Sequence, residues 1–348
     1  MSAPPHDVTS WTGRHDGDGA PHARWHEVVQ VLAELPDTAY DPRSAAEATD
    51  HVALLGFRSD EGVRRNGGRP GAAEGPEALR RALAPMALHG APAAGEIGIL
   101  DRGDVTTAGE DLESGQDEAA AAVTRALDAE GCRLTVVLGG GHETAWPSYR
   151  GLVDSELMSP RADGTRPRWG VLNLDAHFDL RREPRPTSGT PFLQMAEAES
   201  ARGAELEYLV LGIAEPSNTG ILFDTARSRG VRWMTDVDCE QAGAAGVRQV
   251  VEEFAADLDV LYLTVDLDVL PAAVAPGVSA PAALGVSAPI VLAAVAAAAG
   301  TGKLALLDVV ELNPSLDVES RTAKTAARLI DESVRVALGA GAPASEVA

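Results

Sequence analysis

The sequence has little cysteine and no long apolar run. Its 348 residues include two cysteines, Cys132 and Cys239, which provide neither a disulfide framework nor the paired spacing of a zinc site. The longest apolar candidate, residues 288–300, is short and rich in alanine, which argues against a membrane span. The N-terminus lacks a basic segment followed by an apolar run, so we expect no secretory signal. These absences predict a soluble protein of the reducing cytoplasm.

Positive charge is also scarce. The chain has 29 Lys and Arg residues against 52 Asp and Glu residues, a formal net charge of -23. Such an acidic chain disfavours nonspecific binding to nucleic acid or to an anionic membrane, so we expect neither partner. Only Lys303 and Lys324 are lysines. Biased codon usage is the simplest cause, but the arginines are worth considering as carboxylate ligands because their planar guanidinium suits that task.

What the chain does have is an alternation of apolar runs and helical patterns. The apolar runs are 51–57, 96–100, 134–140, 169–174, 208–213, 260–265 and 303–310, and the helical patterns include 75–86, 117–131, 247–258 and 319–338. Continuous apolar strands separated by helices predict a parallel sheet with helices on both faces. We therefore expect a single α/β domain over residues 46–340.

The two ends of the chain lack this alternation. Residues 1–45 are rich in Gly, Pro, Asp and His, apart from a possible helix at 24–35. We expect this segment to be a partly flexible arm packed on the domain. Residues 341–348 are expected to fray.

Polar side chains follow three of the apolar runs directly. They occur in LTVVLGGGHE, in LNLDAHFDLR and in YLTVDLDVL, and they are His142, Asp175, His177, Asp179, Asp266 and Asp268. Alternate side chains of an extended backbone share a face, so the groups from 175 and from 266 can each point one way. Because ligands of a parallel sheet bind beyond the carboxyl ends of its strands, we expect the six side chains to converge.

Two imidazoles and four carboxylates in one place predict a metal site. They repel one another and lose solvation unless a cation lies among them. For DAHFD alone a solvated strand end is an equally good interpretation, and a lone histidine would be structural. Oxygen and nitrogen ligands without a thiolate suit Mn²⁺ better than zinc. Six ligands exceed the needs of one ion, so we expect a bridged pair that can deprotonate a water molecule.

The motifs GGGHE, DAHFD and TVDLD resemble the three signature motifs of the arginase-type ureohydrolases, manganese enzymes that hydrolyse guanidines and amidines. The resemblance covers about residues 51–338. It implies a three-layer α/β/α fold with a parallel, eight-stranded sheet, two Mn²⁺ ions per chain and a homo-oligomer. It also implies that one ion is held by His142, Asp175, Asp179 and Asp266 or Asp268, and the other by His177 with the remaining carboxylates, with Asp179 and Asp266 as bridges.

Longer stretches resemble the formimidoylglutamase branch of this family. They are GFRSDEGVRRNGGRPGAAEGP, GGGHET, DAHFDLR, SGTPF and LDVLPAAVAPGVSAPAALG. Arginases carry a histidine where this chain has Phe192, and the aspartate of the usual GGDH is Gly141 here, which argues against arginase or agmatinase activity. The resemblance therefore implies hydrolysis of N-formimidoyl-L-glutamate to L-glutamate and formamide, a step of histidine degradation.

The resemblance also implies catalytic and substrate-binding residues. Glu311, in DVVELNP, matches the glutamate that receives a cationic amidine, although an exposed acid leading a helix is the structural alternative. Asp179 is the expected proton carrier to the departing nitrogen. For the two substrate carboxylates we expect Arg181, directly after DAHFD, and Arg69, in a Gly-rich loop. Thr190, in SGTPF, is a further expected substrate contact.

Some alternatives stay open at this point. Arg64, Arg65 and Arg182 are interpreted equally well as surface arginines that balance nearby acids. The protein could be a different amidine or guanidine hydrolase, which a panel of substrates would distinguish. It could also be a non-catalytic metal-binding protein on the same scaffold, which would retain manganese without turnover.

Overall fold

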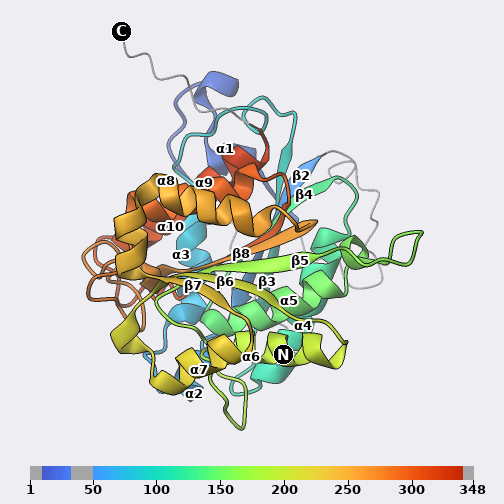
Figure 1. Ribbon diagram of the computed structural model, residues 1–348. Coiled ribbons are helices and arrows are strands. Elements are labelled where there is room, and N and C mark those ends of the chain that lie inside the picture. Colours follow the sequence, from blue (N-terminus) through green and yellow to red (C-terminus); the bar gives the residue numbers. More distant parts are fainter. Residues whose placement is uncertain (1–9, 33–49, 340–348) are drawn as a thin grey trace.

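The computed structural model describes residues 10–32 and 50–339, and it contains one sheet of nine strands (Figure 1). Every strand pairing in this sheet is parallel. The strand order is β1-β3-β2-β4-β9-β8-β5-β6-β7. The strands are β1 (Val29–Val31), β2 (His51–Arg58), β3 (Gly98–Thr106), β4 (Cys132–Leu138), β5 (Trp169–Leu174), β6 (Glu207–Ile213), β7 (Arg232–Thr235), β8 (Val260–Asp266) and β9 (Leu304–Val310).

Helices cover both faces of the sheet, so the predicted three-layer α/β/α fold is confirmed. One face is packed by α3 (Gly75–Leu83), α8 (Asp236–Ala255), α9 (Ala288–Gly300) and α10 (Arg321–Ala337). The other is packed by α4 (Leu112–Leu127), α5 (Ala145–Val153), α6 (Pro191–Ala201) and α7 (Gly220–Ser228). Two short helices, α1 (Trp25–Val28) and α2 (Glu61–Arg65), lie outside these layers.

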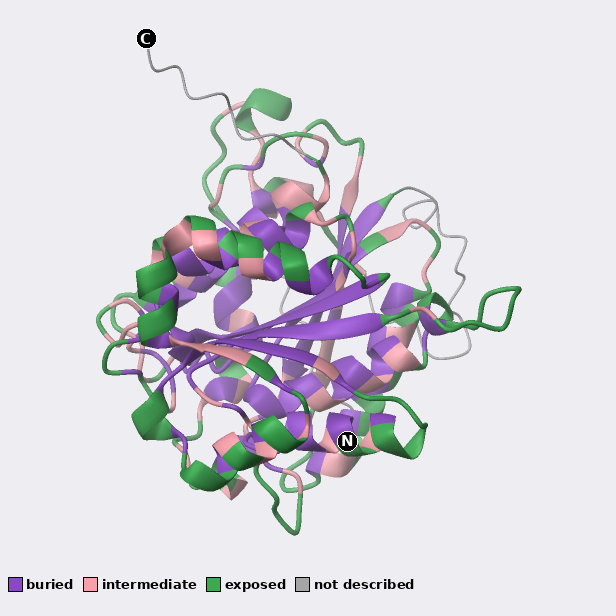
Figure 2. Cartoon of the chain, viewed as in Figure 1, coloured by how far each residue is buried: buried purple, intermediate pink, exposed green. Residues whose placement is uncertain are grey.

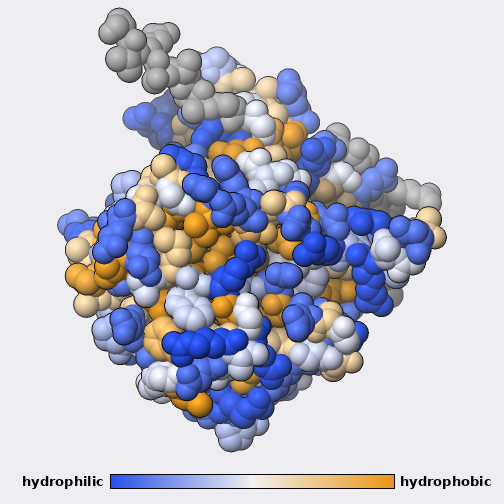
Figure 3. All heavy atoms as spheres, in the orientation of Figure 1, coloured by the Kyte–Doolittle hydropathy of each residue, from blue (hydrophilic) through white to orange (hydrophobic). Residues whose placement is uncertain are grey.

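The burial pattern explains why apolar runs revealed the central strands. Every residue of β5 and of β8 is buried, so neither strand needs the polar alternation of a half-exposed strand. The helices instead bury one stripe and expose the other, as Figure 2 shows. Hydrophilic residues cover most of the face in Figure 3, interrupted by smaller hydrophobic groups. Among the described helices, none combines the length and apolar character needed to cross a membrane.

The sheet has nine strands where eight were expected, and its two edges account for the missed elements. Only the start of the expected helix at 24–35 is present, as α1, which ends at Val28; the chain continues as β1, pairing Val29 with Ile99, and residues 33–35 lie outside the described residues. Valines suit a strand once a partner edge is available. The opposite edge strand, β7, has only four residues and no fully buried one, so it shows no apolar run.

The described part of the N-terminal segment packs on the domain. The indole Nε1 of Trp11 donates to Asp101 Oδ2 over 2.7 Å, and that of Trp25, which is fully buried, donates to Asp331 Oδ1 over 3.0 Å. Because β1 also joins the sheet, this segment contributes to the fold. The expected frayed tail at 341–348, and residues 1–9 and 33–45 of the expected arm, lie outside the described residues.

Four neighbouring strands form the middle of the sheet, in the order β4, β9, β8 and β5. The candidate residues follow the carboxyl ends of these same four strands. In an open parallel sheet such ends form the crevice where ligands bind. The strand order thus brings candidate residues as far apart in the chain as His142 and Glu311 to the carboxyl ends of neighbouring strands.

Candidate metal centre

The structure brings the two histidines and four aspartates together. His142 Nδ1 lies 3.0 Å from Asp179 Oδ2 and 3.1 Å from both Asp175 Oδ2 and Asp266 Oδ2. His177 Nδ1 lies 3.0 Å from Asp268 Oδ2 and 3.5 Å from Asp175 Oδ1. The convergence is as expected, while the role of these residues as metal ligands stays a prediction.

Asp175 is common to two groups of potential ligand atoms. One group contains His142, Asp175 and Asp179, and the other contains Asp175, His177 and Asp268. Within each group the potential ligand atoms lie within 4.8 Å of one another. Asp175 presents Oδ2 to His142 and Oδ1 to His177, whereas Asp179 belongs to the first group alone. Asp175 is thus common to both groups, while the bridging roles expected for Asp179 and Asp266 stay predictions.

The segment after β5 is a bent loop, so the expected extended alternation from 175 to 179 is wrong. Strand β5 ends at Leu174, and Asp179 has a left-handed backbone with φ 47°. Asn218 holds the loop: its Oδ1 accepts the N–H of Phe178 over 3.1 Å, and its Nδ2 donates to the Ala176 carbonyl over 2.9 Å. Fixed loop geometry, and not the period of a strand, aims these side chains.

The segment after β8 also departs from extended backbone. The chain turns into a 3-10 helix at Leu267–Val269, and the N–H of Asp268 donates to Asp266 Oδ1 over 2.8 Å. Asp268 Oδ1 in turn accepts the N–H of Ala176 over 3.2 Å. These bonds tie the β8 segment to the loop after β5, so the two groups of carboxylates have a fixed relation.

The three glycines before His142 allow a close approach of two segments. A Cβ added at Gly140 would lie 1.8 Å from the carbonyl oxygen of Ser59, so only glycine fits there. The N–H of Gly141 donates to that same oxygen over 2.9 Å. This contact packs the exit of β4 against the loop after β2 and sets the position of His142.

The charges of the cluster disturb one another. Burial lowers the pKa of His142, but the surrounding carboxylates outweigh burial and hold it well above the ordinary value. For Asp266, burial raises the pKa and the charge of Asp268 raises it further. Two imidazoles cannot neutralise four carboxylates, so the cluster lacks positive charge.

A divalent cation fits this set of atoms. His142 Nδ1 is buried and has no hydrogen-bond partner of suitable geometry among the described residues, although three carboxylate oxygens surround it. An imidazole nitrogen that faces several carboxylate oxygens without a hydrogen bond is an arrangement that a cation among them stabilises. The donors are all oxygen and nitrogen, which suits Mn²⁺ and similar cations.

Glu311 lies beside this cluster in a strained backbone. It follows β9 with φ 69°, its N–H donates to the Gly140 carbonyl, and its Oε1 accepts the N–H of His142 over 2.8 Å. Burial raises its pKa to about 8, and the charge of Glu143 contributes. Since Glu311 is buried and no helix starts there, the alternative of an exposed acid leading a helix is wrong.

Glu143 is a buried carboxylate that belongs to the GGGHE motif but had no expected role. Its Oε1 accepts the hydroxyl of Ser59 and the N–H of Gly62, each over 2.9 Å. Burial raises its pKa to about 7. Glu143 thus anchors the start of the Gly-rich loop that follows β2, next to the candidate metal centre. The sequence signal was its place directly after His142.

Most of the candidate arginines are engaged elsewhere. Arg64 and Arg65 both pair with Glu61, and Arg182 pairs with Glu197. Arg69 donates from Nε to the carbonyl of Ser279 over 2.9 Å and from a terminal nitrogen to the carbonyl of Val278 over 2.8 Å. Two of the three guanidinium nitrogens of Arg69 therefore hold a loop. Its role in binding substrate stays a prediction.

Arg181 is exposed and, unlike these arginines, its side chain makes no ion pair or hydrogen bond with another described residue. Its stem lies against Gly189, where an added Cβ would be 2.8 Å from Arg181 Cδ and 3.2 Å from Asn66 Nδ2. Asn66 Nδ2 also donates to Ser188 Oγ over 3.2 Å. Sequence reasoning missed Asn66 and Ser188, which add polar groups beside Arg181.

The contacts of the SGTPF segment mainly stabilise the turn before α6. Thr190 Oγ1 accepts the N–H of Thr187 over 3.1 Å and lies 2.7 Å from Gln194 Oε1, so this buried hydroxyl is used within the turn before α6. Its role as a substrate contact stays a prediction. Phe192 stacks on Tyr208 and packs against the ring of His142 at a centroid distance of 5.3 Å.

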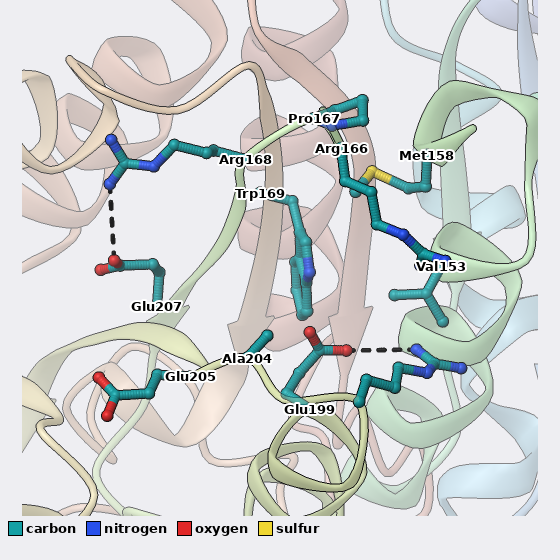
Figure 4. Close-up of a pocket in the computed structure, with 11 residues that line it drawn as sticks. Val153, Met158, Arg166, Pro167, Arg168, Trp169, Glu199, Ala204, Glu205 and Glu207 are labelled. Carbon is teal, nitrogen blue, oxygen red and sulfur yellow. Dashed lines mark hydrogen bonds and ion pairs between the residues drawn. The ribbon is translucent and has the colours of Figure 1, made fainter. Parts of the chain in front are cut away.

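A separate hollow lies at the amino ends of the strands, at the other end from the candidate metal centre (Figure 4). It has a volume of about 570 Å³ and is lined by Trp169, the first residue of β5, and Glu207, the first residue of β6. Figure 4 shows Arg168 directed toward Glu207 and Glu199 paired with an arginine. Because these residues are at the amino ends of the strands, the hollow is not part of the candidate centre.

Comparison with known proteins identifies the family. The model of the Arginase family matches residues 50–335. The formimidoylglutamases of Rhodococcus jostii and Nocardia farcinica are 51% and 52% identical, each over 92% of this chain, and the matches cover 93% and 94% of those proteins. The formiminoglutamase of Trypanosoma cruzi, solved with Mn²⁺, is 27% identical with a TM-score of 0.70, covering 83% of this chain and 93% of that one. The resemblance read from the motifs is confirmed, and the chain belongs to the arginase family.

Proposed function

We propose that this protein hydrolyses N-formimidoyl-L-glutamate to L-glutamate and formamide, as a step of histidine degradation. The formimidoylglutamases that are about half identical over most of the chain support this substrate. The observation that carries the proposal is the convergence of two imidazoles and four carboxylates at the carboxyl edge of β4, β5 and β8. Glu311 and Arg181 flank these residues and suit the two charged ends of the substrate.

The residues that would hold two Mn²⁺ ions are the two overlapping groups around Asp175. His142, Asp175 and Asp179 would hold one ion, and Asp175, His177 and Asp268 would hold the other. Asp266 lies with the first group, at 3.1 Å from His142 Nδ1. When bound, such divalent cations would lower the pKa of a water molecule at the site, which would supply a nucleophile near neutral pH.

Glu311 would bind the amidinium of the substrate. Its Oε1 is already held by the N–H of His142, so the carboxylate cannot turn freely. Burial raises its pKa to about 8, and both a nearby metal cation and the amidinium itself would lower it again. A charge-assisted hydrogen bond would then orient the formimidoyl carbon toward the metal centre.

Asp179 would carry a proton to the departing glutamate nitrogen. Its side chain is 12% exposed and its partner, Asp175, has a fully buried side chain, so Asp179 is the more accessible of the two. Burial and the charge of Asp175 raise the pKa of Asp179. A carboxyl group that exchanges a proton more readily near neutral pH is suited to general acid–base catalysis.

Arg181 would bind a carboxylate of the substrate. Among the five candidate arginines, Arg181 is the one whose side chain has neither an ion-pair partner nor a hydrogen bond within the described chain. Its guanidinium can take a carboxylate through two parallel hydrogen bonds, and Asn66 and Ser188 lie beside it as further polar contacts. Phe192 lies beside His142, at the position where arginases carry a histidine. No imidazole is therefore present at that position.

The direct test incubates the purified protein with N-formimidoyl-L-glutamate and Mn²⁺ and quantifies glutamate, formamide and ammonia separately. Equal amounts of glutamate and formamide without ammonia are expected. Release of ammonia would indicate a different reaction at the amidine. Faster turnover of arginine or agmatine, or tight Mn²⁺ binding without turnover of any amidine, would contradict the proposal.

Arg181→Ala tests the assignment of the carboxylate site. We expect a rise in KM with a smaller change in kcat, because the contact exists in the ground state and the transition state alike. The loss should be about 1.5–3 kcal/mol, the worth of a hydrogen bond between charged groups. Arg182→Ala is the matched control, because Arg182 is the exposed neighbour of Arg181 in the chain but pairs with Glu197. Unchanged KM in Arg181→Ala would remove this residue from the site.

We also propose a reducing compartment and a symmetric assembly. Cys132 and Cys239 are both free thiols, which fits the cytoplasm. A closed homo-oligomer is the common state of soluble metabolic enzymes. Light scattering of the purified protein would measure the assembly directly.

A further inference from the structure

The turn at residues 186–190, just before α6, carries the stem of Arg181. Within the turn, the N–H of Gly189 donates to Thr187 Oγ1 over 3.2 Å, and the N–H of Thr190 donates to the Thr187 carbonyl over 3.3 Å. The carbonyl of Gly189 accepts the N–H of Arg181 over 2.9 Å, and the Arg181 side chain lies against the same glycine. The direction of the Arg181 guanidinium therefore depends on where this turn is held.

Arg65, the last residue of α2, holds the turn from outside. Its side chain is only 7% exposed, and its Nη1 donates to the Pro186 carbonyl over 3.1 Å. Its other hydrogen bonds fix its direction: Nη1 and Nη2 each donate to one oxygen of Glu113 over 2.9 Å, and Nε donates to Glu61 Oε1 over 2.8 Å. A planar guanidinium that is bonded at all three nitrogens cannot turn, so the Pro186 carbonyl has a fixed donor.

Helix α2 is itself anchored beside the metal centre. The N–H of Gly62 donates to Glu143 Oε1 over 2.9 Å, and Glu143 is a buried residue that directly follows His142. At the other end of the helix, Asn66 provides a second tie to the turn, because its Nδ2 donates to Ser188 Oγ over 3.2 Å. The helix thus connects the segment of His142 with the turn.

We propose that Arg65 is a positioning residue, which holds the turn so that Arg181 meets a substrate carboxylate at a fixed place relative to the metal centre. The inference rests on the proposed function, because it needs a substrate with a carboxylate. Arg65 is not itself available to this substrate, since all of its guanidinium nitrogens are bonded to protein groups. Its loss should weaken substrate binding through Arg181 and leave the chemistry at the metal centre unchanged.

The first test compares Arg65→Met with Arg64→Met. In Arg65→Met we expect KM for formimidoylglutamate to rise by about five- to twentyfold, part of the roughly 10- to 100-fold effect of losing a hydrogen bond between charged groups. Both kcat and the dissociation constant of Mn²⁺ should stay within about twofold of the parent values. Arg64 is the matched control, because it pairs with the same Glu61 but its side chain is 49% exposed. Arg64→Met should leave KM within about twofold of the parent value.

A double variant separates positioning from a general loss of structure. If Arg65 acts through Arg181, adding Arg65→Met to Arg181→Ala should raise KM by less than about twofold more, because the contact that it positions is already gone. A merely structural role would raise KM by the same factor with or without Arg181. Arg65→Lys keeps the charge but lacks the fork of a guanidinium, so its KM should still rise by about three- to tenfold. Should Arg65→Met fail to fold, Arg65→Lys in the same two backgrounds decides the question.

Amide hydrogen exchange tests the hold on the turn without any substrate. Mass spectrometry of peptides that cover residues 181–190 should show exchange about three- to tenfold faster in Arg65→Met than in the parent, since the turn loses a hydrogen bond. Arg64→Met should exchange like the parent in these peptides. Peptides from the buried strand β8 should be unchanged in both variants.

Two results would overturn the inference. One is a parent-like KM in both Arg65 variants, and the other is a rise in KM that is equally large in the parent and in the Arg181→Ala background. Either result in a protein that hydrolyses formimidoylglutamate would leave the proposed function standing. Absence of hydrolysis by the parent protein would reject the proposed function instead, and the exchange rates alone would then show whether Arg65 holds the turn.

Discussion

Two buried clusters of charge in this protein differ in whether they contain their own cation. In the first, Arg80 on α3 donates from Nε to Asp101 over 2.8 Å and from a terminal nitrogen to Asp104 over 2.7 Å. The second, at the candidate metal centre, sets two imidazoles against four carboxylates. The side chain of Arg80 is only 2% exposed, so both clusters are inside the protein.

The difference separates a structural cluster from a binding cluster. The guanidinium of Arg80 satisfies both oxygens of Asp101, and Trp11 adds a further donor to the same carboxylate. At the metal centre, by contrast, His142 Nδ1 has carboxylates around it and no hydrogen bond to a described residue. A buried cluster that lacks counter-charge is a candidate site for a cation, whereas a neutralised one mainly supports the fold.

Removing one carboxylate from the metal centre should have the largest effect on activity. Asp268→Asn keeps the acceptor for the N–H of Ala176 but removes a charge next to His177. We expect turnover to be abolished and the manganese content, measured by elemental analysis, to fall. Unfolding of the metal-free protein should change by less than about 1 kcal/mol, because a repelling charge is lost. Normal manganese content in this variant would contradict the assignment of Asp268.

Removing the cation from the structural cluster should instead affect stability. Arg80→Met keeps the bulk of the side chain but removes the positive charge that faces Asp101 and Asp104, so we expect a loss of about 3–5 kcal/mol in chemical denaturation. Folded protein should still bind Mn²⁺. Arg81→Met is the control, because Arg81 is exposed and its ion pair within the described residues, with Glu77, is worth less than about 1 kcal/mol. Equal losses of stability in the two variants would show that the charge of Arg80 does not stabilise the fold.

Replacing Glu311 separates charge from hydrogen bonding at the centre. Glu311→Gln keeps an acceptor for the N–H of His142 and removes the negative charge. We expect kcat/KM to fall by about two orders of magnitude, the effect of losing a group that positions the substrate. The manganese content should stay the same. Near-normal turnover, or loss of manganese, would place Glu311 in a different role.

Acid should erase part of the difference between the parent and Arg80→Met. Burial raises the pKa of Asp101, but Arg80 outweighs burial and lowers it below the ordinary value. A lowered pKa gives stability that is present above the unfolded value and lost as pH falls through the folded value. In Arg80→Met that contribution is absent, so the stability difference should shrink between about pH 5 and pH 3. A constant difference in urea titrations over this range would contradict the interpretation.

The middle of the fold could be predicted from the sequence because buried parallel strands are continuously apolar. Runs such as WGVLNL mark β5 without help from any neighbour. Once a parallel sheet is inferred, the carboxyl ends of its strands must share an edge, so His142 and the aspartates could be placed together. The short edge strands, β1 and β7, carry no such signal, because their faces are only half buried.

The details of the centre could not be predicted, because they depend on contacts distant in the chain. Asn218 fixes the loop after β5 from a position that follows β6. Arg69 is occupied by carbonyl groups of residues 278 and 279, which no local pattern indicates. The turn of Asp179 and Glu311 into left-handed backbone also has no signature, since such residues are uncommon outside glycine.

The left-handed backbone at Asp179 and Glu311 sets a conflict between durability and activity. A non-glycine residue in this conformation carries strain of about 1–3 kcal/mol, which the folded protein tolerates where the side chain is needed. Glycine at either position would relieve that strain and remove the proposed catalytic carboxylate at once. A screen for heat-resistant variants that did not measure turnover would therefore be expected to select glycine at these two positions. Thermal tolerance and catalytic competence should diverge there more sharply than elsewhere in the chain.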